Sequence, residues 1–181
     1  MSRLQPVDPS IATGKAKELL DAVKGKLGIV PNMTRVMATS PVVLESYLGF
    51  SGALADGLLD AKTREQLALL TAQQNHCDYC LSAHTAIGKM AGLSHAQILA
   101  SREGDGSSPR TTAALTFAKR VLDTKGQIGE ADLAAVRSAG FSEGEIAEII
   151  AHVALNVFTN YFNIATDVDI DFPKVSYSEA A

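Results

Sequence analysis

Apolar residues recur at helical spacing along almost the whole of this 181-residue chain. Ala16, Leu19, Leu20, Val23 and Leu27, for example, fall on one face of a helix. No stretch shows the sustained alternation of apolar and polar residues that a half-buried strand requires. Because this pattern excludes most sheet-containing folds, we predict an all-α protein built as a multi-helix bundle.

Residues that start and stop helices divide this pattern into separate elements. Gly28 and Gly126 follow amphipathic runs and are suited to end them. Pro41 is suited to the first turn of a helix, where its missing N–H is not needed. Ser142 and Glu145 form the S-x-x-E pattern of a capping box, which predicts the start of a long final helix.

The length of the chain fits one domain, and a chain of this size buries enough surface to fold without disulfides. We therefore treat residues 1–181 as a single domain. Within it we expect an N-terminal helical extension (1–57), a core (58–125) and C-terminal helices with a tail (126–181). The last part, residues 167–181, is predicted to be irregular and ordered only by packing on a partner.

Charge and hydropathy exclude several classes of protein. A net charge of −4, with no run of Lys or Arg, gives no footprint for nucleic acid or for an anionic membrane surface. The N-terminus lacks the apolar region of a secretory signal. The apolar stretch 146–165 carries Glu148, His152 and three asparagines, which makes it a poor membrane span. We therefore expect a cytoplasmic protein, in which thiols are kept reduced.

Both cysteines of the chain lie in one short segment. If Cys77 and Cys80 occupy the first turn of a helix, their Cα atoms are about 5 Å apart, and the helix start favours a thiolate. His84 follows Cys80 by four residues, so the two side chains share a face with Cβ atoms roughly 5–6 Å apart. An imidazole at that range can accept the thiol proton or stabilise the thiolate.

A carboxylate and a phenol complete this candidate site. If the chain reverses around Asn75, Glu65 lies ten residues before the reversal and His84 nine after it, at the same level of an antiparallel helix pair. Glu65 could then orient His84 directly or through one water, which is the arrangement of nucleophile, base and orienting carboxylate. Tyr79 could donate its hydroxyl to a thiolate or a bound substrate, or simply cover the site.

Metal binding is the main alternative for a Cys-x-x-Cys motif. Zinc needs four ligands, and the candidates near in sequence are Cys77, Cys80, His84 and either His76 or His95. The first three on one short helix give poor tetrahedral geometry. Two non-enzymatic interpretations remain open: a redox-switch interaction protein, and a helical zinc-binding structural protein.

The combined motif has a known counterpart. The pattern Glu65-x11-Cys77-Asp-Tyr-Cys80-x3-His84, followed by AIGKMAGLS, resembles the alkylhydroperoxidase D-like (AhpD-like) members of the carboxymuconolactone decarboxylase superfamily. The upstream segment VPNMTRVMATSP and the downstream segment EIAEIIAHVALNVFTNYFNIATDVDIDFP resemble the peroxidase-related branch of that superfamily. The resemblance covers most of the chain.

The resemblance implies an AhpD-like helical fold in homodimers that often build trimers or hexamers, and an antioxidant thiol peroxidase that works without metal, haem or another cofactor. By carry-over, Cys80 is the peroxidatic thiol, Cys77 the resolving thiol, His84 the proton acceptor and Glu65 the second relay member. Tyr79 stands where the founding enzyme has a histidine. The implied partners are a hydroperoxide and a dithiol reductant such as a lipoyl-bearing protein.

The helix dipole and the neighbouring base predict different cysteines as the nucleophile. The helix dipole, worth about 0.3–1 kcal/mol, favours Cys77 at the helix end. The neighbouring base His84 favours Cys80. Because a specific base at hydrogen-bond range can outweigh the dipole, we predict that Cys80 attacks the peroxide and that Cys77 then closes the disulfide.

Overall fold

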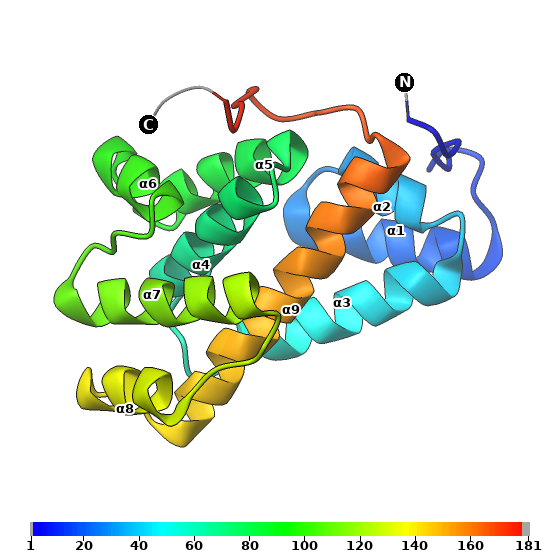
Figure 1. Cartoon of the computed structure of the whole chain (residues 1–181). Helices are drawn as coiled ribbons and strands as arrows, with labels where there is room; N and C mark the ends of the chain where they lie inside the picture. Colours follow the sequence, from blue (N-terminus) through cyan, green and yellow to red (C-terminus); the bar gives the residue numbers. More distant parts are fainter. Residues whose placement is uncertain (1, 179–181) are drawn as a thin grey trace.

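The computed structural model describes residues 2–178, and this range is all-α, with no strand. No helix within it has both the length and the apolar character that a membrane span requires. The helices, shown in Figure 1, are α1 (Gly14–Leu27), α2 (Asn32–Met37), α3 (Pro41–Ala55), α4 (Ala61–Gln74), α5 (Asp78–Met90), α6 (His95–Arg102), α7 (Pro109–Thr124), α8 (Glu130–Ser138) and α9 (Glu143–Thr166).

Helix α4 is the centre of the bundle. It packs against α5, α6, α7 and α9, and residues 67–72 are buried all the way round the helix. Such a helix has no solvent face, which agrees with the apolar run in its sequence. Its start is fixed by Asp60, whose side chain accepts a hydrogen bond from the Thr63 N–H at 3.0 Å.

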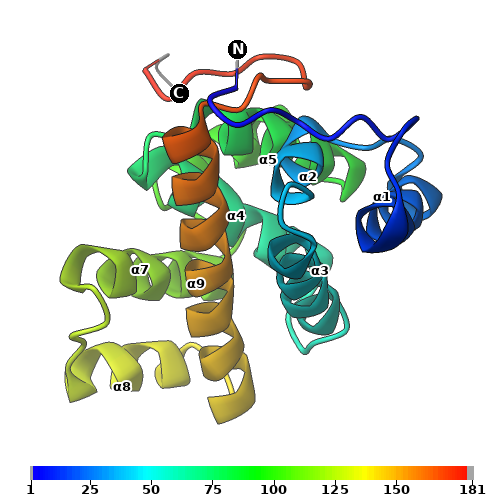
Figure 2. The same cartoon turned by 90° about the vertical axis from the view of Figure 1, so that its right-hand side faces the viewer.

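Two apolar clusters lie on either side of this centre. The upper core comprises Leu20, Met33, Val36, Met37, Leu44, Leu69, Cys77, Tyr79, Cys80 and Leu81, among others. The lower core includes Leu67, Leu70, Leu115, Phe117, Val136, Phe141, Ile146, Ile149 and Val153. Helix α9 runs the length of the molecule beside both, with α7 and α8 on one side and α1 to α3 on the other (Figure 2).

The predicted helix boundaries hold with one small difference. Helix α1 ends at Leu27, and the next residue, Gly28, has a φ of 76° in the left-handed region that glycine tolerates best. Pro41 is the first residue of α3. Helix α7 ends at Thr124, slightly earlier than predicted, because Lys125 already adopts the left-handed conformation (φ 54°) before Gly126.

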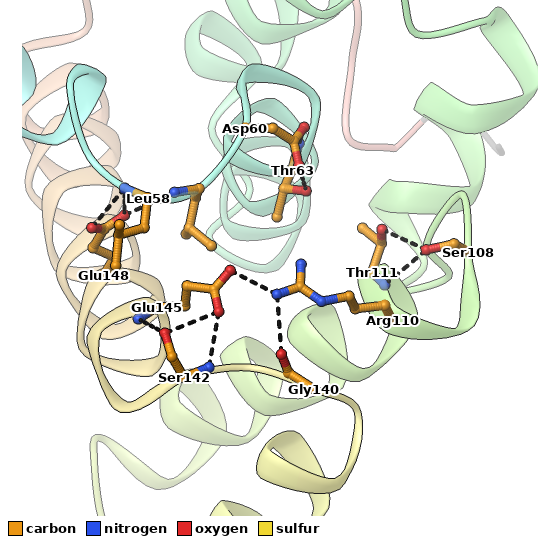
Figure 3. Close-up of polar contacts among 11 residues, drawn as sticks. Leu58, Asp60, Thr63, Ser108, Arg110, Thr111, Gly140, Ser142, Glu145 and Glu148 are labelled. Atoms are coloured by element: carbon orange, nitrogen blue, oxygen red, sulfur yellow. Dashed lines mark hydrogen bonds and ion pairs between the residues drawn. The ribbon is translucent and has the colours of Figure 1, made fainter.

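The start of α9 is held by several polar contacts (Figure 3). The predicted capping box is present: the Ser142 N–H donates to the Glu145 carboxylate at 2.8 Å, and the Glu145 N–H donates to Ser142 Oγ at 3.2 Å. Arg110 of α7 donates to the same carboxylate at 2.6 Å. One turn further on, Glu148 accepts from the Leu58 N–H at 2.8 Å, which ties the loop before α4 to α9.

The C-terminal tail is irregular, as predicted, but the expectation that only a partner orders it is wrong. Residues 167–178 lie against the chain's own α5, at the top of Figure 1. The Val175 N–H donates to Ser82 Oγ at 2.9 Å, and the Tyr177 N–H donates to the Asp78 carboxylate at 2.8 Å. These polar groups of α5 provide the partners that the tail backbone needs. The last three residues lie outside the described part of the chain.

Candidate active site

The turn between α4 and α5 brings the site together. Asn75 ends α4, His76 adopts a left-handed conformation (φ 57°) and Cys77 caps the start of α5. The Cys77 N–H closes the turn by donating to the Ala72 carbonyl at 3.0 Å. The chain therefore reverses at the position inferred from the sequence, and α5 returns alongside α4.

Glu65 and His84 face each other across this helix pair. Glu65 Oε2 lies 2.8 Å from His84 Nδ1, so the contact that the spacing predicted is present and direct. The side chains are only 16% and 22% exposed, respectively. With Nδ1 directed at the carboxylate, Nε2 is the nitrogen left to exchange protons with another group.

The surroundings of His84 favour its charged form. Burial lowers the pKa of the imidazole, but the charge and the hydrogen bond of Glu65 raise it, and a negative Cys80 raises it further. The net result is a pKa above the ordinary value for histidine. A histidinium held in this way can stabilise a thiolate and can return a proton to a leaving group.

The two cysteines occupy the first turn of α5, as predicted. Cys77 is the N-cap residue, and its Sγ accepts a hydrogen bond from the Cys80 N–H at 3.3 Å. Cys80 is the third residue of the helix. The thiols are not joined in a disulfide, and the residues are only 1% and 3% exposed. The pair is therefore adjacent, reduced and enclosed.

The pKa values of the two thiols are shifted in opposite directions. Burial raises the pKa of Cys80, but hydrogen bonds from the Cys77 thiol and the Asn163 amide, the positive charge on His84 and, to a smaller extent, the Asn160 amide lower it to about 7. The pKa of Cys77 is raised, because its thiol donates to Cys80 and is itself buried. This difference supports Cys80 as the nucleophile.

Sequence reasoning missed the asparagines of α9. Asn163 Nδ2 donates to the Sγ of Cys80 at 3.1 Å. One turn earlier, Asn160 Oδ1 accepts from Asn75 Nδ2 at 2.9 Å, which joins α9 to the α4–α5 turn. A signal was available, because Asn156, Asn160 and Asn163 recur at helical spacing in an otherwise apolar run. In the sequence alone, these asparagines serve only as evidence against a membrane span.

Tyr79 is placed differently from the other predicted site residues. Its hydroxyl accepts a hydrogen bond from the Met33 N–H at 3.1 Å, and its ring meets the edge of Phe172 with centroids 5.8 Å apart. Burial is the main reason that the pKa of the phenol is raised. The hydroxyl thus anchors α2, and the ring is buried in the same apolar cluster as the two cysteines.

The candidate zinc ligands are not arranged as a metal site. No three side chains of His, Cys, Asp or Glu are grouped to hold a metal ion anywhere in residues 2–178. His76, a candidate fourth ligand, instead stacks on Tyr177 with ring centroids 4.4 Å apart. His95 is exposed at the start of α6. The helical zinc-binding interpretation is therefore not supported by the arrangement of these side chains.

Comparison with known proteins relates the central part of the chain to one family and its fold to solved structures. Residues 41–120, from the start of α3 into α7, match the carboxymuconolactone decarboxylase family. The whole fold is similar to the AhpD-core, peroxidase-related protein of Ralstonia eutropha JMP134, with a TM-score of 0.85, 25% identity and coverage of 94% of this chain and 92% of that one. The fold is therefore AhpD-like, and its central region matches the carboxymuconolactone decarboxylase family.

Two further relatives of this AhpD-like protein are informative. An uncharacterized protein of Haemophilus influenzae is 47% identical over 45 residues, a match that spans 24% of this chain and 40% of the relative. The debrominase Bmp8, solved as a Cys-to-Ala variant with 2,3,4-tribromopyrrole, has a TM-score of 0.76 at 19% identity, covering 93% of this chain and 91% of that one. The fold therefore supports more than one activity.

Proposed function

We propose that this AhpD-like protein is a thiol peroxidase that reduces hydroperoxides through a dithiol–disulfide cycle of Cys77 and Cys80. The observation that carries the proposal is the buried pair of free thiols, Cys77 and Cys80, at the start of the helix that also carries His84, whose Nδ1 lies 2.8 Å from the Glu65 carboxylate. The pKa of the Cys80 thiol is lowered to about 7, so about half of it is thiolate at neutral pH, and the thiolate is the reactive form.

The first half of the cycle oxidises Cys80. Its thiolate attacks the terminal oxygen of the hydroperoxide, so that an S–O bond forms and the O–O bond breaks. The departing alkoxide takes a proton and leaves as an alcohol. His84, held protonated by Glu65, is the proton donor that the geometry offers. Cys80 is left as a sulfenic acid.

The second half closes and reopens the disulfide. Cys77 attacks the sulfur of the Cys80 sulfenic acid, the S–S bond forms, and the hydroxyl leaves with the Cys77 proton as water. The two thiols have then supplied the two electrons that reduced the peroxide. A dithiol reductant, such as a lipoyl-bearing protein, restores the pair by exchange and leaves as a disulfide. The adjacency of the two cysteines makes the closing step intramolecular.

A homo-oligomer in the cytoplasm belongs to the same proposal. Large apolar side chains are exposed along one face of α9, with Phe158 at 40%, Tyr161 at 60% and Ile164 at 44%. Val42 and Phe50 of α3 are also exposed. Exposed apolar surface of this kind is typical of subunit contacts. Light scattering after gel filtration would test it, and a monomer at micromolar concentration would contradict it.

The function is tested by peroxide consumption with a dithiol donor. We expect the reduced protein to turn over tert-butyl hydroperoxide with dihydrolipoamide, and the Cys80→Ser variant to lose this activity. The Cys77→Ser variant should still form a sulfenic acid on Cys80, which dimedone would label, but should not turn over through the intramolecular disulfide.

Two results would change the proposal. Labelling of the variant that retains only Cys77 would reverse the roles of the cysteines. If the wild-type protein forms its disulfide but consumes no peroxide at steady state, the redox-switch alternative becomes the better one. Capture of a mixed disulfide by the Cys77→Ser variant would identify the reductant.

A further inference from the structure

We propose that Asn163 of α9 is a catalytic residue that stabilises the Cys80 thiolate by direct hydrogen bonding and thereby selects Cys80 over Cys77 as the nucleophile. This inference deepens the proposed function and rests on it for its catalytic meaning. Asn163 Nδ2 lies 3.1 Å from Cys80 Sγ and 3.2 Å from Met33 Sδ. The residue is only 3% exposed, so bulk water does not compete for these contacts.

The chemistry of the two sulfurs sets the orientation of this amide. A thiolate and a thioether are both acceptors, so they require the NH₂ end of Asn163 to face them. The oxygen end of the amide makes no hydrogen bond: Asn163 Oδ1 is buried with no partner in the described part of the chain. Since an unpartnered buried acceptor is destabilising, an amide held in this way is better explained by the sulfur than by packing.

The donors also differ between the two cysteines. Cys77 Sγ accepts the backbone N–H of Cys80, at 3.3 Å. Cys80 Sγ receives the Asn163 amide at 3.1 Å and in addition the Cys77 thiol. An amide donates at every pH, whereas His84 stabilises the thiolate only while it is protonated. Asn163 therefore provides a stabilisation of the Cys80 anion that does not depend on the charge of His84.

The position of Asn163 is itself well fixed. The hydrogen bond from Asn75 Nδ2 to Asn160 Oδ1, at 2.9 Å, sets α9 against the turn that carries the cysteines. Asn163 lies three residues further along the same face. Helix α9 brings only amides to Cys80; the titratable groups that interact with this thiol come from the other elements, namely Cys77, Tyr79 and His84 of α5, Glu65 of α4 through His84, and Tyr47 of α3.

The test is the pH dependence of alkylation of Cys80 by iodoacetamide, measured in the Cys77→Ser background so that one thiol reacts. We expect Asn163→Ala to raise the midpoint of this titration by about one pH unit, which means about tenfold less thiolate at any pH well below both midpoints. Asn163→Asp, nearly identical in shape, should raise it further, because it places a second negative charge beside the sulfur.

A matched control exists on the same helix. Asn156 is buried two turns before Asn163, and its Nδ2 donates only to the His152 carbonyl, at 2.8 Å. Asn156→Ala removes the same side chain without touching the cysteines, so the midpoint should stay at the background value. Thermal unfolding of every variant identifies those that fold, and the isosteric Asn163→Asp variant covers the case in which Asn163→Ala does not.

An unchanged midpoint in a folded Asn163 variant overturns the proposal, including when that variant is less stable, since this is the behaviour of a merely structural residue. The measurement needs no peroxide. A shifted midpoint without peroxide consumption would leave the role of Asn163 towards the thiolate standing and refute the proposed function. Peroxide consumption with an unshifted midpoint would support the proposed function and refute the role of Asn163.

Discussion

The two halves of α9 bury side chains of opposite chemistry. Its first half contributes Ile146, Ile149 and Val153 to the lower core. Its second half buries Asn156, Thr159, Asn160, Asn163 and Thr166, all at most 8% exposed, on the side where the cysteines lie. The first half of this helix thus stabilises the fold, and its second half positions a reactive sulfur.

The polar half bears an energetic cost that the apolar half does not. Asn160 Nδ2 and Asn163 Oδ1 are buried without a hydrogen-bond partner among the described residues, and so is Nε2 of His152, between the two halves. Buried polar atoms of this kind are uncommon in folded proteins and are concentrated where function requires them. The comparison predicts that substitutions in the first, lower half of α9 reduce stability, whereas substitutions of Asn160 and Asn163 in its second, upper half change the reactivity of the Cys80 thiol.

The largest effect on stability is expected from Ile149→Ala in the lower half. Ile149 is 0% exposed, and its truncation leaves a cavity as well as removing apolar contacts. The free energy of unfolding should fall by about 2–5 kcal/mol in urea denaturation. The alkylation midpoint of Cys80 should not move. A change of the midpoint in a folded protein would show that the two halves are coupled.

A smaller, pH-dependent effect is expected from Glu65→Gln. Glu65 raises the pKa of His84 above the ordinary 6.5, so its stabilisation is fully present below that pH and is lost as pH rises through the raised folded-state pKa. We expect the variant to be less stable than the wild type by about 1.5 kcal/mol at pH 6. The difference should shrink at higher pH. A difference that grows with pH, in denaturation curves measured across this range, would contradict the assignment.

The N-cap of α9 should contribute less to the stability of the fold than Glu65 does. Ser142→Ala removes the hydroxyl that accepts the Glu145 N–H at 3.2 Å, and such caps are worth about 1 kcal/mol. Thermal unfolding should detect this loss while peroxide consumption stays at the wild-type rate. Slower turnover would mean that the start of α9 also positions its far end.

The smallest effect on stability is expected from Asn160→Leu, in the upper half. The substitution removes an amide whose nitrogen is buried and unpartnered, so the lost hydrogen bond from Asn75 is offset. The free energy of unfolding should change by less than about 1 kcal/mol, in either direction. Reaction of Cys80 with hydroperoxide should nevertheless slow, because the Asn160 amide helps to lower the pKa of this thiol. A loss above about 2 kcal/mol would show that Asn160 belongs to the structural half of the comparison.

Local interactions explain why much of the site could be predicted. Helical periodicity, the capping box at Ser142 and the left-handed Gly28 are short-range features, and they gave the correct fold class and most helix ends. The contact of Glu65 with His84 also follows from local geometry, because a tight turn between two helices sets their register. The sequence itself determined this half of the site.

Tertiary packing decided the rest. Asn163 is 83 residues from Cys80, the tail reaches Ser82 across 93 residues, and the Tyr79 hydroxyl pairs with Met33 rather than a thiol. No periodicity relates such positions, because the angle at which α9 crosses the α4–α5 pair depends on how all the side chains between them pack. The sequence thus placed a base beside a cysteine, and the assembled bundle supplied the buried amide that favours one sulfur over the other.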